Sequence, residues 1–163
     1  MKRLGIAVTI LALGLAGCGD DNNGNPAGPS NLTVFTVQLS PANEVPPITN
    51  AENTARGTAV ITVNSQANTI DFAVSLNSFP TTSVLTAAHI HPGAAGVNGG
   101  VLIGTGLTSG NAPSLSSGSG TFSFPGVGAT ADQIAQILAN PQNFYFNVHS
   151  TLNGPGVMRG QLR

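Results

Sequence analysis

Short runs of β-branched and apolar residues recur along this chain, and glycine, proline and asparagine separate them. The clearest run places Ile70, Phe72, Val74 and Leu76 at every second position. In a β-strand such residues share one face, so this run predicts a strand with one buried face and one polar face. Frequent turn residues between runs are typical of many short strands packed as a sandwich or barrel. The chain is therefore constrained to an all-β architecture.

Similar runs predict seven further strands, at residues 33–39, 57–63, 85–91, 101–104, 120–124, 144–149 and 157–162. The runs at 57–63 and 69–76 flank a five-residue connection and predict a hairpin. The stretch 104–120 is rich in glycine and serine, which favours a loop.

One segment departs from the strand pattern and predicts a helix. Thr130 is a candidate N-cap, and Gln133 three residues later completes a capping box. Ile134, Ile137 and Leu138 then fall on one face, and Pro141 ends the segment. We expect this helix to cover an open end of the β-core.

The first residues resemble an export signal. Lys2 and Arg3 precede an apolar run at 4–16, which is too short to span a membrane but suits a signal peptide. The run ends at Leu15-Ala16-Gly17-Cys18, which resembles the lipobox of bacterial lipoproteins. This resemblance implies cleavage before Cys18 and attachment of acyl chains, palmitate among them, to that cysteine. An ordinary secretory signal with an incidental cysteine is the alternative.

Three regions follow from this interpretation: a lipoprotein signal peptide at 1–17, a flexible tether at 18–31 and a single domain at 32–163. The tether consists mainly of asparagine, glycine, proline and aspartate, which bury too little apolar surface to fold. Gly19 after the cysteine favours an outer-membrane or cell-surface address over retention at the inner membrane. We therefore expect a protein of the bacterial cell envelope whose lipid anchor makes the membrane a partner.

Charge is sparse and excludes some partners. Charged residues make up 7% of the chain, and removal of Lys2 and Arg3 would leave three arginines against six acidic residues. A net charge of about −3 with no basic patch argues against nucleic acid as a partner. Cys18 is the single cysteine, so an intramolecular disulfide is excluded. The sequence names no protein partner.

All three histidines of the chain occur in two short motifs, which are Ala88-His89-Ile90-His91-Pro92 and Asn147-Val148-His149-Ser150. Residues i and i+2 of a strand point to the same face, so His89 and His91 form a pair of neighbouring imidazoles. His149 on a neighbouring strand would complete a three-nitrogen site for a transition metal. Neutral imidazoles suit copper, or alternatively zinc.

Three segments together resemble the chordin-type (CHRD) domain found in chordin and in many bacterial exported proteins. They are Leu39 to Pro47, then Ala88 to Gly93 with Asn98-Gly99-Gly100, and finally Phe144 to Arg163 with its Asn-Val-His-Ser and Arg-Gly-Gln-Leu elements. The resemblance implies an immunoglobulin-like β-sandwich, distantly similar to copper/zinc superoxide dismutase. It brings no settled biochemical function. The chain has Val157-Met158 where the family commonly has Glu-Ile, so no role of that carboxylate carries over.

Three hypotheses about the role of the histidines remain open. The first is an envelope-anchored binding module with a mononuclear copper or zinc site at His89, His91 and His149. The second is a structural or protein-interaction domain without metal, in which backbone carbonyls, Asn147 and Ser150 bind the ring nitrogens. The third is a superoxide dismutase-like copper enzyme, against which the lack of a fourth histidine and of a zinc-site constellation argues. We assign no catalytic residue.

Two other polar residues have expected roles. Glu44, before Pro46-Pro47, is expected to pair with Arg56 or Arg159 and so to fix its turn on the sheet. Arg159 is expected to tie strands or loops together, and Met158 beside it is expected in the core rather than as a copper ligand.

Overall fold

The structure is a computed structural model that describes residues 31–163. The predicted signal peptide, Cys18 and all but the last residue of the predicted tether lie outside the described residues. None of the described helices is long and apolar enough to cross a membrane.

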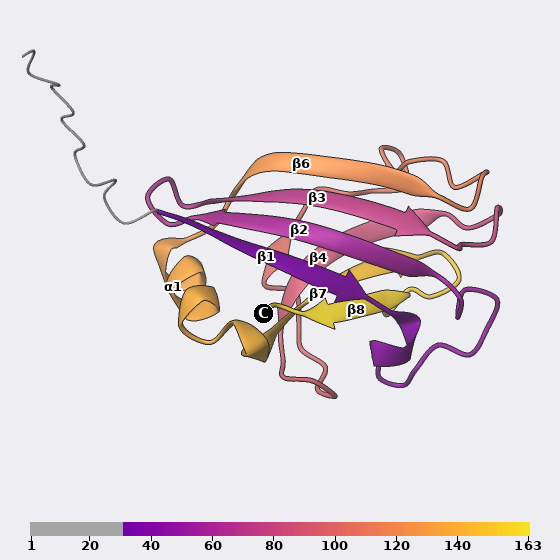
Figure 1. Cartoon of the computed structure of the whole chain (residues 1–163), viewed down its shortest axis with the longest axis horizontal. Coiled ribbons are helices and arrows are strands. Elements are labelled where there is room, and N and C mark those ends of the chain that lie inside the picture. Colours follow the sequence, from indigo (N-terminus) through magenta and orange to yellow (C-terminus); the bar gives the residue numbers. More distant parts are fainter. Residues whose placement is uncertain (1–30) are drawn as a thin grey trace, which may run out of the picture.

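Eight strands form two antiparallel four-stranded sheets that pack face to face, so the predicted all-β sandwich is confirmed (Figure 1). The first sheet has the order β1-β2-β3-β6, with β1 at Leu32–Leu39, β2 at Arg56–Asn64, β3 at Thr69–Asn77 and β6 at Gly120–Gly128. The second has the order β5-β4-β7-β8, with β5 at Ile103–Gly104, β4 at Leu85–Pro92, β7 at Phe144–Ser150 and β8 at Met158–Gln161.

The predicted hairpin is confirmed, because β2 and β3 pair in register from Arg56↔Asn77 to Asn64↔Thr69. Strand β6 extends four residues beyond its predicted end at Phe124. It continues past Pro125 because a register shift opposite Asp71 accommodates the irregularity, and the Asp71 carboxylate accepts the Gly126 N–H at 2.7 Å.

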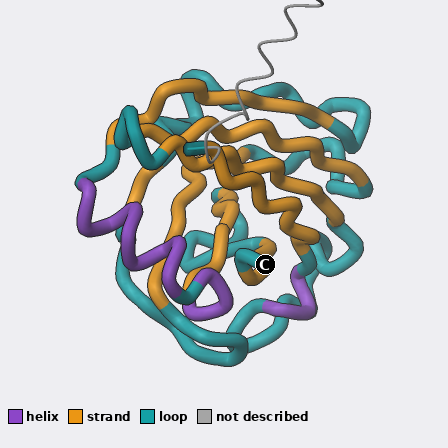
Figure 2. Tube along the Cα trace, turned by 60° about the vertical axis from the view of Figure 1, so that its left-hand side comes forward, coloured by secondary structure: helices purple, strands orange, loops and turns teal. Residues whose placement is uncertain are grey.

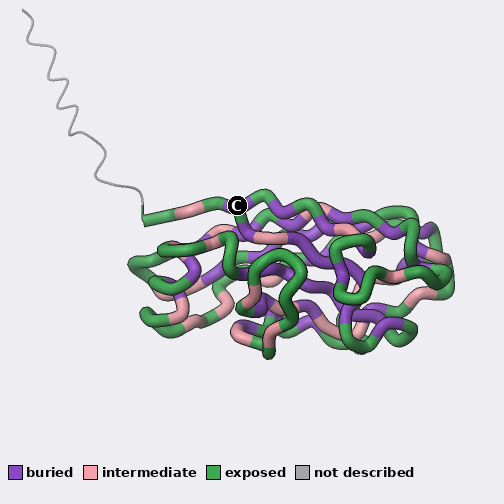
Figure 3. The backbone as a smooth tube through the Cα atoms, turned by 90° about the horizontal axis from the view of Figure 1, so that it is seen from below, coloured by how far each residue is buried: buried purple, intermediate pink, exposed green. Residues whose placement is uncertain are grey.

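The core lies between the two sheets. Alternate residues of each strand point into it, so buried and exposed residues alternate along the first sheet (Figure 3). Phe72 of β3 stacks on Phe146 of β7 with ring centroids 5.6 Å apart, which joins the two layers. Met158 is fully buried in this core, as expected.

Helix α1 spans Ala131–Ala139 and lies at the end of the sandwich where β1 begins (Figures 1 and 2). The predicted capping box between Thr130 and Gln133 is present. Ile134 and Ile137 are buried against the core. The short 3-10 helix η1 (Pro41–Asn43) begins the connection between β1 and β2. A second 3-10 helix, η2 (Pro141–Asn143), directly precedes strand β7.

Candidate metal site

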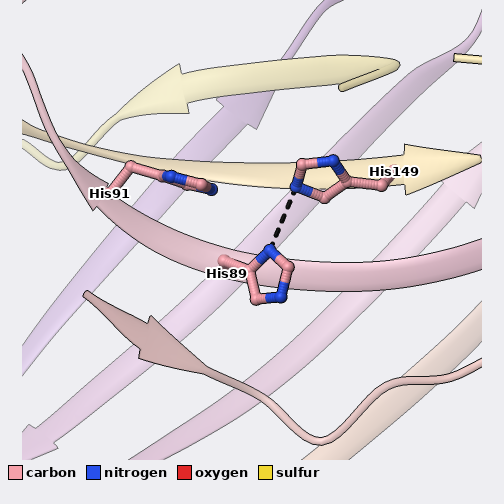
Figure 4. A group of neighbouring side chains, drawn as sticks. All are labelled: His89, His91 and His149. Carbon is pink, nitrogen blue, oxygen red and sulfur yellow. Dashed lines mark hydrogen bonds between the residues drawn. The ribbon is translucent and has the colours of Figure 1, made fainter. Parts of the chain in front are cut away.

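The three histidines lie on the outer face of the second sheet, on its two central strands. Ala88 and Ile90 of β4 and Val148 of β7 point into the core, so the alternating residues His89, His91 and His149 point the other way. His89 pairs with Asn147 and Ala87 pairs with His149, which places His149 diagonally beside His89. The predicted convergence of the two motifs is therefore observed (Figure 4).

The imidazole nitrogens are close enough to share one ion. Each histidine offers one nitrogen such that all three lie within 4.8 Å of one another. The His89 Nδ1 and His149 Nε2 atoms are 3.1 Å apart. Ring centroids are separated by 4.9 Å for His89–His149, 5.5 Å for His89–His91 and 5.8 Å for His91–His149.

Hydrogen bonds to backbone carbonyls determine which ring nitrogen of His91 and of His149 carries the proton and which keeps a lone pair. The Nδ1 atom of His91 lies 3.1 Å and 3.0 Å from the carbonyl oxygens of Gly99 and Gly100, and the Nδ1 atom of His149 lies 2.9 Å from that of Gly154. A carbonyl only accepts, so both Nδ1 atoms carry the proton. Both Nε2 atoms therefore keep a lone pair, and that of His91 is buried without a hydrogen-bond partner.

Burial keeps the histidines neutral. Desolvation, together with smaller effects of the neighbouring His149 and His91, lowers the pKa of His89 to about 4. Desolvation also lowers the pKa of His91 and of His149, although hydrogen bonds to backbone carbonyls act in the opposite direction. His91 and His149 are 6% and 7% exposed. At neutral pH all three rings thus hold the uncharged form that binds metal ions.

Three loops cover this face of the sheet. The side chain of Asn98 donates to the carbonyl of Val45, and Asn50 and Asn153 exchange hydrogen bonds, which joins the loops to one another. Buried Glu52 accepts the Ser150 hydroxyl and the Asn153 amide, each at 2.6 Å. A cavity of about 400 Å³ remains between the loop at 44–50 and the side chains of His91 and Tyr145.

Tyr145 and Arg159 extend the cluster across the sheet. The Tyr145 ring stacks on His91 with centroids 4.9 Å apart and planes 6° apart. The guanidinium carbon of Arg159 lies 4.5 Å from the centroid of the same ring. His91 and Arg159 come from the strands on either side of β7, so Tyr145 separates them.

Arg159 joins the loops, as expected, but it does so through uncharged groups. It donates to the carbonyls of Asn43 and Val97 and to the side-chain oxygen of Asn98. Within the described residues it forms no ion pair with Glu44, so that expectation is wrong. Arg56 also fails to pair with Glu44, since it donates to the carbonyls of Asn53 and Ala55. Glu44 is instead buried with Oε1 unpartnered, and desolvation raises its pKa to about 7 against the lowering effect of Arg159.

Of the partners expected for the histidines under the structural interpretation, backbone carbonyls are observed, whereas the expectation for Asn147 and Ser150 is wrong. Ser150 donates to Glu52, and the Oδ1 atom of Asn147 has no partner. The glycine carbonyls that hold the rings carried no signal in the sequence, because any residue supplies a carbonyl. Tyr145 could have been found, since it stands at i−4 from His149 in the same strand and must share its face.

The fold and the site together define a class: an all-β sandwich with a covered three-imidazole cluster on one outer face. The chain matches the CHRD domain family over residues 35–162, and it belongs to that family. Neither the curated proteins nor the solved structures contain a significant match to the chain.

Proposed function

We propose that this CHRD-domain protein is a metal-binding module that holds one copper or zinc ion between His89, His91 and His149. The observation that carries the proposal is the fixed tautomer of two rings. With both Nδ1 protons donated to carbonyls, the Nε2 atoms of His91 and His149 keep their lone pairs, and that of His149 accepts the His89 Nδ1 proton until an ion displaces it. A second set of contacts that orients histidine ligands in this way is typical of metal sites.

The chemistry of the donor set favours copper or zinc. Within the described residues the cluster contains three imidazoles and no carboxylate or thiolate. Neutral nitrogen ligands suit copper and zinc better than magnesium or calcium, which prefer oxygen. Three protein ligands leave a further coordination position for water or a small ligand. His89 would bind through Nδ1, the atom that faces His149, after its proton moves to Nε2 or to solvent.

Calorimetric titration of the purified protein with Zn²⁺ and with Cu²⁺ at pH 7.5 tests this proposal. We expect one ion per chain, and a loss of affinity of at least about 100-fold in His89→Ala, which removes the half-exposed ligand at small cost to folding. Ser123→Ala, on the exposed face of the other sheet, is the matched control and should bind like the wild type. Absence of uptake, or uptake that His89→Ala does not change, would contradict the proposal.

A structural role is the second candidate, and the same hydrogen bonds favour it. His91 and His149 tie the loops at 99–100 and 154 to the sheet without any ion. In that case the domain would act as a structural or protein-interaction module of the envelope. His149→Ala would then destabilise the fold while the wild type takes up no metal in the titration above.

We also propose a cellular localisation for the protein. The signal and lipobox-like residues that end at Cys18 support a lipid-anchored protein of the bacterial envelope. Mass spectrometry of the mature N-terminal peptide tests it, since an acylated Cys18 is expected and an unmodified chain that retains Met1 would refute it.

A further inference from the structure

The guanidinium of Arg159 is a buried charge without a counterion in contact. Arg159 is 2% exposed, and its side chain donates hydrogen bonds to two carbonyls and one amide oxygen. Its Nη2 atom is buried without any partner. An arginine keeps its positive charge even when it is buried. The charge is therefore permanent and weakly screened by solvent.

This charge is connected to the three-histidine cluster through one aromatic ring. Arg159 lies over Tyr145, and Tyr145 stacks on His91 in nearly parallel planes. All three side chains come from adjacent strands of one sheet, so their spacing is fixed by backbone pairing. Desolvation is the main cause that lowers the pKa of His91, and the positive charge of Arg159 adds a smaller lowering effect in the same direction.

An ion bound by three neutral imidazoles keeps its full charge, because the cluster within the described residues contains no anionic ligand. A neighbouring fixed cation then disfavours a divalent ion more than a monovalent one. For one unit of ion charge at roughly 10 Å and an effective dielectric constant of about 20, the difference corresponds to about tenfold in affinity.

We propose that Arg159, acting across Tyr145 on His91, is a specificity-determining residue that biases the histidine site toward monovalent copper and against divalent ions. This inference rests on the proposed metal site and specifies its preference. Arg159 does not touch the ion and acts through its charge. Glu44 lines the neighbouring cavity and interacts with Arg159 through space, so its carboxylate opposes the effect in part.

The two charges provide a test with opposite signs. The readout is the Cu(II)/Cu(I) reduction potential of the copper-loaded protein at pH 8. Arg159→Gln should lower the Cu(I)/Cu(II) affinity ratio about tenfold, which is a fall of about 59 mV for a one-electron couple. Glu44→Gln should raise the ratio by a smaller factor. Its side chain forms no hydrogen bond through Oε1, so this variant tests the proposal even if Arg159→Gln fails to fold.

Arg56→Gln is the matched control, because it removes the same charge from an exposed arginine that donates to carbonyls, and it should leave the potential unchanged. Shifts of opposite sign in the Arg159 and Glu44 variants support the proposal. Equal potentials in the wild type and Glu44→Gln, or a shift of the same sign in both variants, would overturn it. A wild-type protein that binds no copper would refute the proposed metal site itself, whereas binding with unshifted potentials would refute the role of Arg159 alone.

Discussion

The two sheets of the sandwich have the same strand number and the same inward alternation, yet their outer faces differ. The outer face of β1-β2-β3-β6 carries short side chains that contact solvent: Thr58, Val60, Asp71, Ala73, Ser75, Thr121 and Ser123. The outer face of β5-β4-β7-β8 carries three histidines, Tyr145, Asn147 and Arg159, and most of these are buried.

The difference comes from the loops rather than from the strands. Every residue of β7 is buried, although only its alternate residues face the core. Loops held together by Glu52, Asn98 and Arg159 cover the remaining side of this strand. A β-sheet thus acquires a desolvated polar layer when loops cover a face that alternation alone would leave wet. Desolvation is also what holds the histidines in their neutral form.

The largest expected effect is a loss of stability on substitution of Glu52, a carboxylate of the loops that cover the second sheet. Glu52→Ala removes the acceptor of two buried hydrogen bonds, so the Ser150 hydroxyl loses its acceptor and the Asn153 amide keeps only its longer contact with Asn50. We expect a loss of about 2 to 4 kcal/mol in the free energy of unfolding, measured by urea denaturation. Metal affinity should also fall, because the loop that carries Gly154 loses its attachment.

Asp71→Ala is the comparison on the other face. Asp71 is exposed and accepts a single backbone N–H. The expected loss is about 0.5 to 1.5 kcal/mol, with metal affinity unchanged. Equal losses in the two variants would show that loop coverage does not distinguish the faces.

The pH dependence of stability gives an intermediate effect. The pKa of His89 falls from its usual 6.5 to about 4 on folding, so its contribution is present above pH 6.5 and is lost as the pH falls toward 4. After allowance for screening at this half-exposed group, we expect about 1 to 2 kcal/mol. Denaturation of the metal-free protein between pH 4 and 8 measures it, and His89→Gln should flatten the curve.

Glu44 acts with the opposite sign. Its pKa rises from 4.5 to about 7 on folding, so its contribution is present below pH 4.5 and is lost as the pH rises through 7. Glu44→Gln should therefore make the protein relatively more stable at pH 8 than at pH 5, compared with the wild type. A variant curve parallel to that of the wild type would contradict the burial of this carboxyl.

The smallest effect is expected on the open face. Ser123 is exposed on β6 and forms no side-chain hydrogen bond within the described residues. Ser123→Ala should change the free energy of unfolding by no more than about 0.5 kcal/mol. A loss above about 1 kcal/mol in the same urea experiment would indicate that this face is covered in solution.

Local patterns in the sequence predicted most of the fold. Period-two alternation located the strands, and the Thr130–Gln133 pair located the start of α1, because both signals depend on neighbouring residues alone. The same alternation placed His89 beside His91. Its convergence with His149 needed the pairing of β4 with β7, which the family resemblance implied and the register shows.

Contacts between distant loops could not be predicted in the same way. Arg159 lies more than 60 residues from Val97 and Asn98, and it takes neutral partners where a charge-pairing argument favours Glu44. Glu52 is similar, since its partners Ser150 and Asn153 are about 100 residues away. Only the three-dimensional packing of the loops decides which of several polar residues meets which.

The carbonyls of Gly99, Gly100 and Gly154 have a consequence for how this site could change over time. Ring orientation is encoded in loop conformation, so substitutions that preserve the path of the chain leave the imidazoles in place, whatever side chains the loops carry. Gly99 is an exception, because a Cβ there would collide with the Pro92 carbonyl. Substitution of side chains one by one would therefore identify the three histidines but not the backbone carbonyls that orient them. Because the backbone conformation orients the rings, the sequence of the covering loops can change, and with it access to the cluster, while the imidazoles keep their positions.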